Sequence, residues 1–317
     1  MLIALHIIGG LLLLVAGGEG LVRGSVSIAK KMGIPVIIIG LTIVSLGTSA
    51  PEMVISVLST LDGKPDIAIG NVIGSNIANI LLILGLTALI YPVTTDPDII
   101  KRDGILMVLA TIIMVIFAEG GIIGRFEGMI LLAITAGYLF SLFRRSRQSN
   151  SQDVVEEFEE ETAFEYEWLT SIILIVGGMA ALIIGAEFMV NGASELARIY
   201  GASEGVIGVT IVAIGTSAPE LMTCLVAAYR KHSDIAVGNV VGSNFFNITA
   251  VLGVASTTAP MTVSQEFLQV DIWVMVVAST LLVPLMLSDK KVTRTEGGIM
   301  VFWYVAYLIY QYMKVTG

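Results

Sequence analysis

The sequence has very few residues of the types that build disulfide frameworks and transition-metal sites. Its 317 residues include one cysteine, Cys224, and two histidines, His6 and His232. One cysteine excludes a disulfide within the chain, and two histidines offer no transition-metal cluster. Charged residues are also scarce, at 14%, against 56% hydrophobic residues and a mean hydropathy of +0.90. This composition predicts an integral membrane protein in contact with the lipid bilayer, with no nucleic-acid partner.

Long apolar runs recur over the whole length of the chain. About 20 mostly apolar residues are needed to cross roughly 30 Å of hydrocarbon. The first run has no basic residues before it and no small-residue cleavage site, so we expect a retained span rather than a signal peptide. The runs predict an all-α polytopic membrane protein with ten transmembrane helices. The predicted spans are residues 2–22, 34–60, 67–91, 104–118, 127–143, 168–189, 206–229, 235–259, 271–287 and 297–314.

A polar segment separates residues 1–147 from residues 168–317. Residues 148–167 contain eight acidic residues and no basic one, which we interpret as a solvated linker. Loose cation binding by this segment is the weaker alternative. Of the 17 lysines and arginines, 13 fall in the connections after odd-numbered spans and 4 on the other side. The positive-inside rule therefore predicts a cytoplasmic linker and both termini outside, as in a cell-membrane protein.

The two halves of the chain are related by a constant offset of 168 residues. Between residues 42–79 and 210–247, 19 of 38 positions are identical, and many of these are polar or helix-breaking residues. Each half holds five predicted spans, and an odd number means that the second half crosses the membrane in the opposite sense. We therefore expect two inverted five-helix repeats, an arrangement typical of secondary transporters with a site near the bilayer midplane.

The hexapeptide GTSAPE occurs twice inside apolar runs, at residues 47–52 and 215–220. Pro51 lacks an N–H, so the helix is expected to kink and to free the carbonyl of residue 47. In hydrocarbon a freed carbonyl needs another partner, and a bound cation is one. The hydroxyl and carboxylate side chains of each copy lie three or four residues apart and can share one helix face. They are Thr48, Ser49 and Glu52, and Thr216, Ser217 and Glu220.

A second motif is repeated in the span that follows each hexapeptide. Residues 66–79 read DIAIGNVIGSNIAN and residues 234–247 read DIAVGNVVGSNFFN. In each copy a serine and an asparagine four residues apart share a helix face: Ser75 with Asn79, and Ser243 with Asn247. Glycines four residues apart favour close helix packing. The acids that begin the motifs, Asp66 and Asp234, are interpreted as helix caps rather than ligands.

The assembled candidates supply only oxygen ligands: two carboxylates, hydroxyls, amides and freed carbonyls. Such a set suits hard cations, and a flexible cage favours Ca²⁺ over Mg²⁺. Two carboxylates ~5 Å apart at an effective dielectric of ~20 repel by roughly 3 kcal/mol, so an empty site should resist occlusion. One Ca²⁺, or two or more Na⁺ or protons, would neutralise it. A protein whose binding site switches between the two sides of the membrane only when that site is neutralised is an antiporter.

These two repeated motifs in ten spans resemble the calcium/cation antiporter superfamily, in its sodium/calcium exchanger branch. The resemblance implies a non-enzymatic transporter of Ca²⁺ and Na⁺ that needs no cofactor, and no obligatory protein partner is evident. It implies that Glu52 and Glu220 bind Ca²⁺, and that Asn79 and Asn247 line the middle of the site. Sodium ligation is implied for Thr48, Ser49, Thr216, Ser217, Ser75 and Ser243, with the backbone carbonyls of Ser45 and Ala213.

The resemblance also bears on potassium and on the moving helices. The potassium-dependent branch carries an aspartate where this chain has Asn247, so exchange independent of K⁺ is expected. It is expected to be electrogenic if more than two Na⁺ replace one Ca²⁺. In this family the first and sixth spans are thought to move across the core. Glu19 and Glu187 lie on these spans, and we expect a structural or interfacial role for both.

Three other functions remain open at this stage. A calcium/proton antiporter on the same fold would use the glutamates as proton carriers, although the hydroxyl-rich hexapeptide favours Na⁺. An intramembrane hydrolase is disfavoured because no histidine accompanies the glutamates and Ser49 is not set in a nucleophile elbow. A passive cation channel would be excluded by counter-transport against a gradient.

Overall fold

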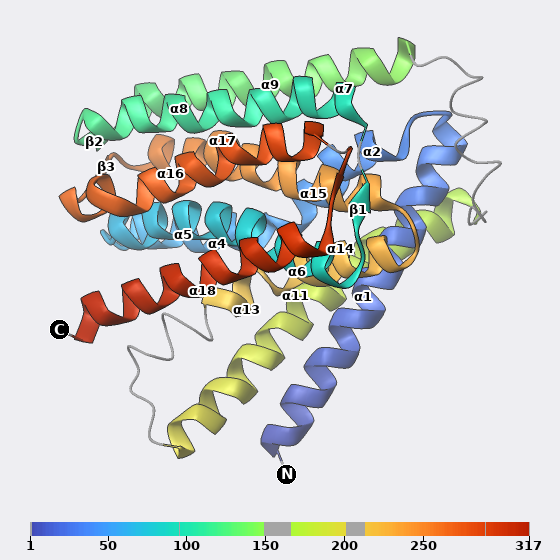
Figure 1. Ribbon diagram of the computed structural model, residues 1–317, viewed down its shortest axis with the longest axis horizontal. Coiled ribbons are helices and arrows are strands. Elements are labelled where there is room, and N and C mark those ends of the chain that lie inside the picture. Colours follow the sequence, from blue (N-terminus) through green and yellow to red (C-terminus); the bar gives the residue numbers. More distant parts are fainter. Residues whose placement is uncertain (1, 95, 149–165, 201–212, 289, 317) are drawn as a thin grey trace.

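The computed structural model describes residues 2–94, 96–148, 166–200, 213–288 and 290–316 (Figure 1). Nearly all of these residues are helical, which confirms the predicted all-α membrane protein. Residues 149–165 of the predicted linker lie outside the described residues, so the division of the chain at the linker stays a prediction.

The first half contains a long helix, a broken helix and a series of helices joined by short strands. Five-residue and longer π-helical segments, labelled η, continue several of the α-helices. The elements are α1 (Leu2–Met32), α2 (Val36–Ile39), η1 (Gly40–Val44), α3 (Ser45–Thr48), α4 (Ala50–Leu61), α5 (Pro65–Ile77), η2 (Ala78–Leu84), α6 (Gly85–Ile90), β1 (Val93–Thr94), α7 (Pro97–Ile99), η3 (Ile100–Gly104), α8 (Ile105–Glu119), β2 (Ile122–Ile123) and α9 (Arg125–Gln148).

The second half repeats this order where it is described. Its elements are α11 (Trp168–Ile199), α13 (Ala213–Thr216), α14 (Ala218–Tyr229), α15 (Ser233–Phe246), η5 (Asn247–Val251), α16 (Leu252–Thr258), β3 (Met261–Thr262), η6 (Phe267–Asp271), α17 (Ile272–Ser288), β4 (Lys291–Val292) and α18 (Arg294–Thr316). The π-helical segments recur at corresponding places, η2 with η5 and η3 with η6.

Six of the described helical segments are long and apolar enough to cross a membrane. A seventh span is formed if the helices 36–48 and 50–61, which meet at 42°, are counted together. The other predicted spans correspond to α8, to α18 and to the segment containing α14, the last of which begins among residues outside the described ranges. The count of ten spans therefore remains an expectation with which the fold agrees.

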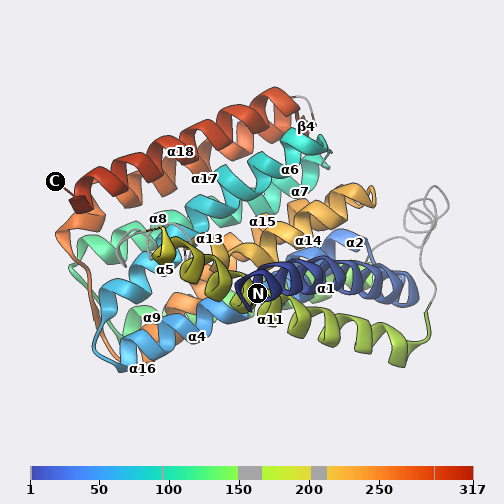
Figure 2. The same cartoon turned by 90° about the horizontal axis from the view of Figure 1, so that it is seen from below.

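The helices α1 and α11 are longer than predicted and lie side by side, tilted away from the other helices (Figures 1 and 2). They cross through glycines. A Cβ at Gly17 would lie 2.7 Å from the carbonyl oxygen of Gly178, and one at Gly10 would lie 2.7 Å from that of Gly185. These four glycines are related by the 168-residue offset, so the contact is symmetric. Any larger side chain would force the two helices apart.

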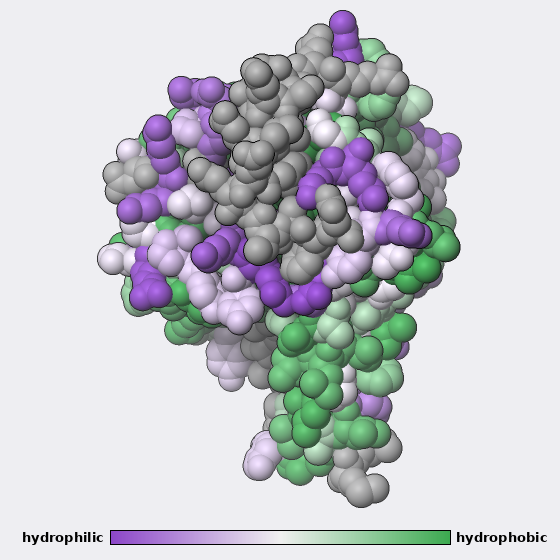
Figure 3. Space-filling view, turned by 90° about the vertical axis from the view of Figure 1, so that its right-hand side faces the viewer, coloured by the Kyte–Doolittle hydropathy of each residue, from purple (hydrophilic) through white to green (hydrophobic). Residues whose placement is uncertain are grey.

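The outer surface of α1 and α11 is apolar. Leu5, Leu12, Leu169 and Val176 are each at least 60% exposed, as expected for side chains that contact lipid. Figure 3 shows this apolar surface on the part that extends from the molecule, and hydrophilic side chains gathered on the neighbouring face.

The last helix of each half packs on the third predicted span of the other half. Helix α9 packs on α16, and α18 packs on α6. Gly128 of α9 approaches Gly253 of α16, and Gly297 of α18 approaches Gly85 of α6. The short strands also pair between the halves: β1 pairs antiparallel with β4, and β2 pairs antiparallel with β3. The two halves are thus interlocked rather than placed beside one another. In the middle lies α15, on which every residue from Ile235 to Phe246 is buried.

Glu19 joins α1 to the end of α14. Its carboxylate forms an ion pair with Arg230, the residue that follows α14, and another with Arg23, one turn further along α1. The expected interfacial role is therefore seen for Glu19. Its counterpart in the second half, Glu187, is exposed on α11.

Candidate functional site

Both GTSAPE segments break a helix, and both do so at the serine. Ser49 has φ −80° and ψ 3° between α3 and α4, and Ser217 has φ −91° and ψ 6° between α13 and α14. The sequence predicted the kink but placed it at the proline. Pro51 instead stands in the first turn of α4, where the N–H it lacks has no helical partner in any case. The bend therefore occurs just before that turn.

Each break places a glutamate in the first turn of the helix that follows. Glu52 is 1% exposed and Glu220 is 2% exposed, and in the described part of the chain neither forms an ion pair with a basic residue. The two carboxylates are close enough to interact electrostatically, and Thr48 of the first hexapeptide lies close to Glu220 of the second. The helix N-termini offset part of this negative charge. The remainder requires a cation or a proton, because unpaired buried carboxylates are costly in a membrane.

The hydroxyls of the two motifs meet across the two halves of the chain. Thr48 Oγ1 donates to Oδ1 of Asn239 on α15 at 3.0 Å and lies 3.5 Å from Ser243 Oγ. Ser243 Oγ donates to the same Asn239 oxygen at 3.3 Å. Thr48 and Ser243, both predicted ligands, are thus brought together by a residue that was not predicted.

The two motif asparagines are held by amides of the opposite half. Asn79, near the start of η2, donates to Oδ1 of Asn244 at 3.0 Å. Asn247, the first residue of η5, donates to Oδ1 of Asn76 at 3.3 Å. These symmetric amide pairs connect α5 and η2 of the first half to α15 and η5 of the second.

Sequence reasoning missed four asparagines that support the site. Besides Asn76 and Asn244, these are Asn71, which donates to Glu52 O at 3.1 Å and to Ser56 Oγ at 2.9 Å, and Asn239, which donates to Cys224 Sγ at 3.4 Å. All four belong to the second motif and are identical between its two copies. That repetition was the available signal. Asp66 and Asp234 are in the first turns of their helices, where the N-cap residues are Lys64 and His232. They therefore influence the helix ends as first-turn charges and are not the N-caps.

Several oxygen atoms in this region are buried and have no hydrogen-bond partner within the described residues. Because such groups are rare unless they bind something, they indicate a ligand site. The oxygens are Ser49 Oγ, Glu52 Oε2, Ser217 Oγ, both carboxylate oxygens of Glu220, and Asn247 Oδ1. No group of three His, Cys, Asp or Glu side chains suited to a metal occurs in the part of the chain described. The donor set is therefore one of hydroxyls, amides and two carboxylates, which suits hard cations.

The remaining predicted residues lie near this set. Ser45 is fully buried; its carbonyl accepts the Ser49 N–H at 3.0 Å, and its hydroxyl donates to Gly40 O at 2.6 Å. Ala213 begins α13, and its side chain is outside the described part. Thr216 is half-buried, unlike its counterpart Thr48, and together with Ser75 it lines a cavity of about 450 Å³. The ligand roles themselves stay predictions.

Comparison with known proteins places this geometry in context. The family model described as sodium/calcium exchanger protein matches residues 2–144 and 170–313. The sodium/calcium exchanger MaX1 of Methanosarcina acetivorans is 32% identical, with 95% of each chain covered. The inner membrane protein YrbG of Escherichia coli is 37% identical over 80% of this chain and 79% of its own. The solved structure of the sodium/calcium exchanger from Methanococcus jannaschii has a TM-score of 0.83 and is 32% identical, with 97% of this chain and 98% of that chain covered.

Proposed function

The chain belongs to the sodium/calcium exchanger family, and we propose that it exchanges Ca²⁺ for Na⁺ at the site between its two GTSAPE segments. Family membership makes the chain a multi-pass membrane antiporter rather than an enzyme. The observation that carries the assignment of the site is the pair Glu52 and Glu220. Both are buried and without a basic partner in the described residues, and the serines of both hexapeptides add buried oxygens that are also unpaired there.

Sodium is the proposed counter-ion because hydroxyls and amides accompany the carboxylates. A proton needs only a carboxylate, whereas Na⁺ needs several uncharged oxygens around it. Ser49 and Ser217 offer buried hydroxyl oxygens that are unpaired within the described residues, which supports sodium over proton coupling.

Exchange is proposed to be independent of K⁺ and electrogenic. The positions that could supply a third negative charge are occupied by Asn79 and Asn247, whose amide nitrogens are engaged by Asn244 and Asn76. The site then carries a charge of about −2, which one Ca²⁺ neutralises. Replacement of Ca²⁺ by three Na⁺ would move one net positive charge per cycle.

The test is uptake of radioactive Ca²⁺ into proteoliposomes loaded with Na⁺. We expect uptake when Na⁺ is high inside and low outside, and none when both sides contain equal Na⁺. A pH gradient without Na⁺ should drive no uptake. Uptake driven by a proton gradient alone would show that the counter-ion is H⁺ rather than Na⁺. Uptake that needs only a Ca²⁺ gradient, with no counter-ion gradient, would identify a channel.

A further inference from the structure

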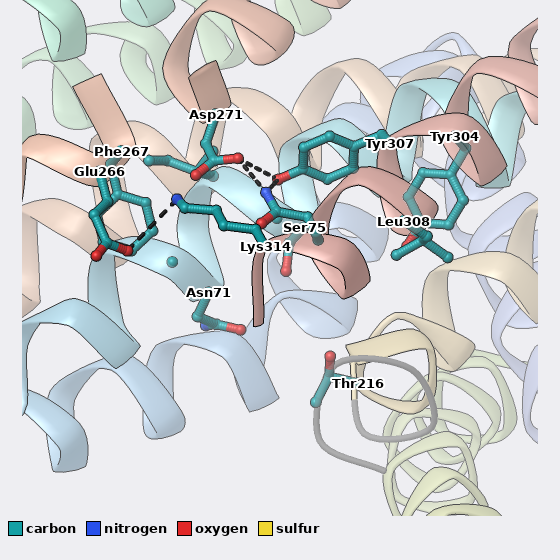
Figure 4. A pocket seen from close by; sticks show the side chains of 14 residues that line it. Asn71, Ser75, Thr216, Glu266, Phe267, Asp271, Tyr304, Tyr307, Leu308 and Lys314 are labelled. Atoms are coloured by element: carbon teal, nitrogen blue, oxygen red, sulfur yellow. Dashed lines mark hydrogen bonds and ion pairs between the residues drawn. The ribbon is translucent and has the colours of Figure 1, made fainter. Parts of the chain in front are cut away.

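A cavity of about 450 Å³ leads away from the predicted ion site (Figure 4). Ser75 and Thr216, two predicted ligands, lie in its wall, and Asp271, Tyr307, Gln311 and Lys314 line another part of it. In Figure 4, Ser75 appears between Asp271 and Thr216. The cavity therefore connects a carboxylate that plays no part in the proposed site to residues that do.

Asp271 is a buried carboxylate with one oxygen engaged and one free. It is 4% exposed, at the end of η6. Tyr307 OH donates to Asp271 Oδ1 at 2.9 Å, and Gln311 Nε2 donates to the same oxygen. Asp271 Oδ2 has no hydrogen-bond partner within the described residues, and Asp271 forms no ion pair there. A buried negative charge held only by neutral donors on one oxygen is poorly compensated.

The equivalent carboxylate in the first half of the chain is fully compensated. Asp103 precedes Asp271 by the repeat offset of 168 and is the penultimate residue of η3, whereas Asp271 is the last residue of η6. Arg145 Nη1 lies 2.9 Å from its Oδ1, and Arg102 Nη2 lies 3.2 Å from its Oδ2. This comparison shows that the fold can neutralise the position with arginine, and that among the described residues it does so only in the first half.

The residue that corresponds to Arg145 in the second half is directed elsewhere. From the starts of α9 at Arg125 and of α18 at Arg294 the offset between the halves is 169, so Tyr138 and Arg145 of α9 align with Tyr307 and Lys314 of α18. The Lys314 ammonium lies 3.5 Å from Glu266 Oε2, an exposed carboxylate in the same cavity wall, and forms no ion pair with Asp271 (Figure 4). The cavity is left with one buried carboxylate that no basic side chain among the described residues neutralises.

We propose that Asp271 is a second cation-binding site, on the path through this cavity to Glu52 and Glu220. Its ligand is a hard cation such as Ca²⁺, bound through Asp271 Oδ2 and water within the cavity. Ser75 Oγ, which makes no hydrogen bond within the described residues, is the next oxygen along the path. The site raises the local concentration of cation next to the transport site, and Lys314 opposes it through like-charge repulsion.

Direct binding is tested with Tb³⁺, a luminescent substitute for Ca²⁺ that is excited through nearby tyrosines. The Glu52→Gln/Glu220→Gln protein removes the transport site and should still show Tb³⁺ emission, because Tyr307 contacts Asp271. Adding Asp271→Asn should abolish that emission, whereas Asp271→Glu should retain it. Emission absent from the double glutamate variant, or unchanged by Asp271→Asn, would overturn the proposal. This measurement does not depend on the proposed exchange activity.

The second test rests on the proposed function and measures Ca²⁺ transport from the side on which the cavity opens. Asp271→Asn should raise the KM for Ca²⁺ about fivefold with little change in kcat, and Lys314→Gln should lower it about twofold. Asp98→Asn, which removes an exposed carboxylate outside the cavity, is the matched control and should change neither. Opposite shifts distinguish an electrostatic role from damage to the fold, since damage would impair both variants. Unchanged KM in both variants would contradict the second site even if exchange itself is intact.

Discussion

Asn79 donates to Oδ1 of Asn244 at 3.0 Å, so the amide of one half of the chain fixes the amide of the other. The equivalent bond, from Asn247 to Asn76, is 3.3 Å long. Through these bonds a predicted ligand in each half depends on a residue of the opposite half for its orientation. The bonds leave Asn247 Oδ1 buried and without a partner in the described residues, as an oxygen that a cation can use.

The amide pairs predict a loss of affinity when the supporting partner is removed. Asn244→Ala deletes the acceptor of Asn79 and should weaken Ca²⁺ binding about tenfold, since residues that orient metal ligands typically contribute that much. It should also lower the free energy of unfolding by about 1–3 kcal/mol. Asn244→Asp retains the oxygen acceptor and should keep Asn79 in place. Calorimetric titration with Ca²⁺ measures the affinity, and a folded Asn244→Ala protein with normal affinity would contradict the orienting role.

The two glutamates predict loss of transport without loss of the fold. Glu52→Gln and Glu220→Gln each remove half of the negative charge proposed to face Ca²⁺ and should abolish or severely impair exchange. Because a buried unpaired carboxylate is costly, the Tm without Ca²⁺ should be unchanged or higher. In the wild type, Ca²⁺ at 100 times its Kd should add about 2.7 kcal/mol of stability, and the variants should lose that increment. Near-normal Ca²⁺ flux in either variant would refute the shared site.

The neutral asparagines predict exchange that does not require potassium. Sodium-driven Ca²⁺ flux should be the same when choline replaces K⁺ on both sides of the membrane. Asn247→Asp adds a third negative charge to the proposed site and should strengthen cation binding. A wild-type flux that disappears without K⁺ and returns when it is added would show that the argument from neutral asparagines is wrong.

The distribution of basic residues predicts which side of the membrane each loop occupies. Lys31, in the last turn of α1, and Asp62, after α4, are both exposed and lie at opposite ends of the second predicted span. In a Cys224→Ala background, Lys31→Cys should be labelled by an impermeant thiol reagent only from the cytoplasmic side, and Asp62→Cys only from outside. The opposite labelling pattern would invert the proposed orientation while leaving the fold unaffected.

The sequence predicted the helical fold, the two helix breaks and the residues that gather around them, because each is encoded by residue types that repeat at one offset. It did not predict the supporting role of Asn71, Asn76, Asn239 and Asn244. These residues act through contacts between helices distant in sequence, and periodicity within one helix carries no information about such contacts. The kink was misplaced by two residues because a proline in the first turn of a helix is tolerated, so the break precedes it.

Two further features had no usable signal in the sequence. The strands β1 to β4 are two residues long and pair across the halves, so they show no alternation that would reveal them. The different partners of Arg145 and Lys314 are also invisible in the aligned repeats, because both halves hold an aspartate and a basic residue there, and packing decides which contacts they make. The loss of the other arginine is visible, since Val270 stands where the first half has Arg102.

The pairing of strands and helices between the two halves of the chain has a consequence for biosynthesis. Strand β1 cannot form its ladder until β4, close to the end of the chain, has been synthesised, and α9 lacks its most extensive packing partner until α16 has entered the bilayer. The first half therefore remains in the membrane with its pairing surfaces uncovered until the second half is made. The nascent chain is most vulnerable to degradation during this interval. Conversely, two separately expressed halves inserted in opposite senses already carry every surface needed to recognise one another.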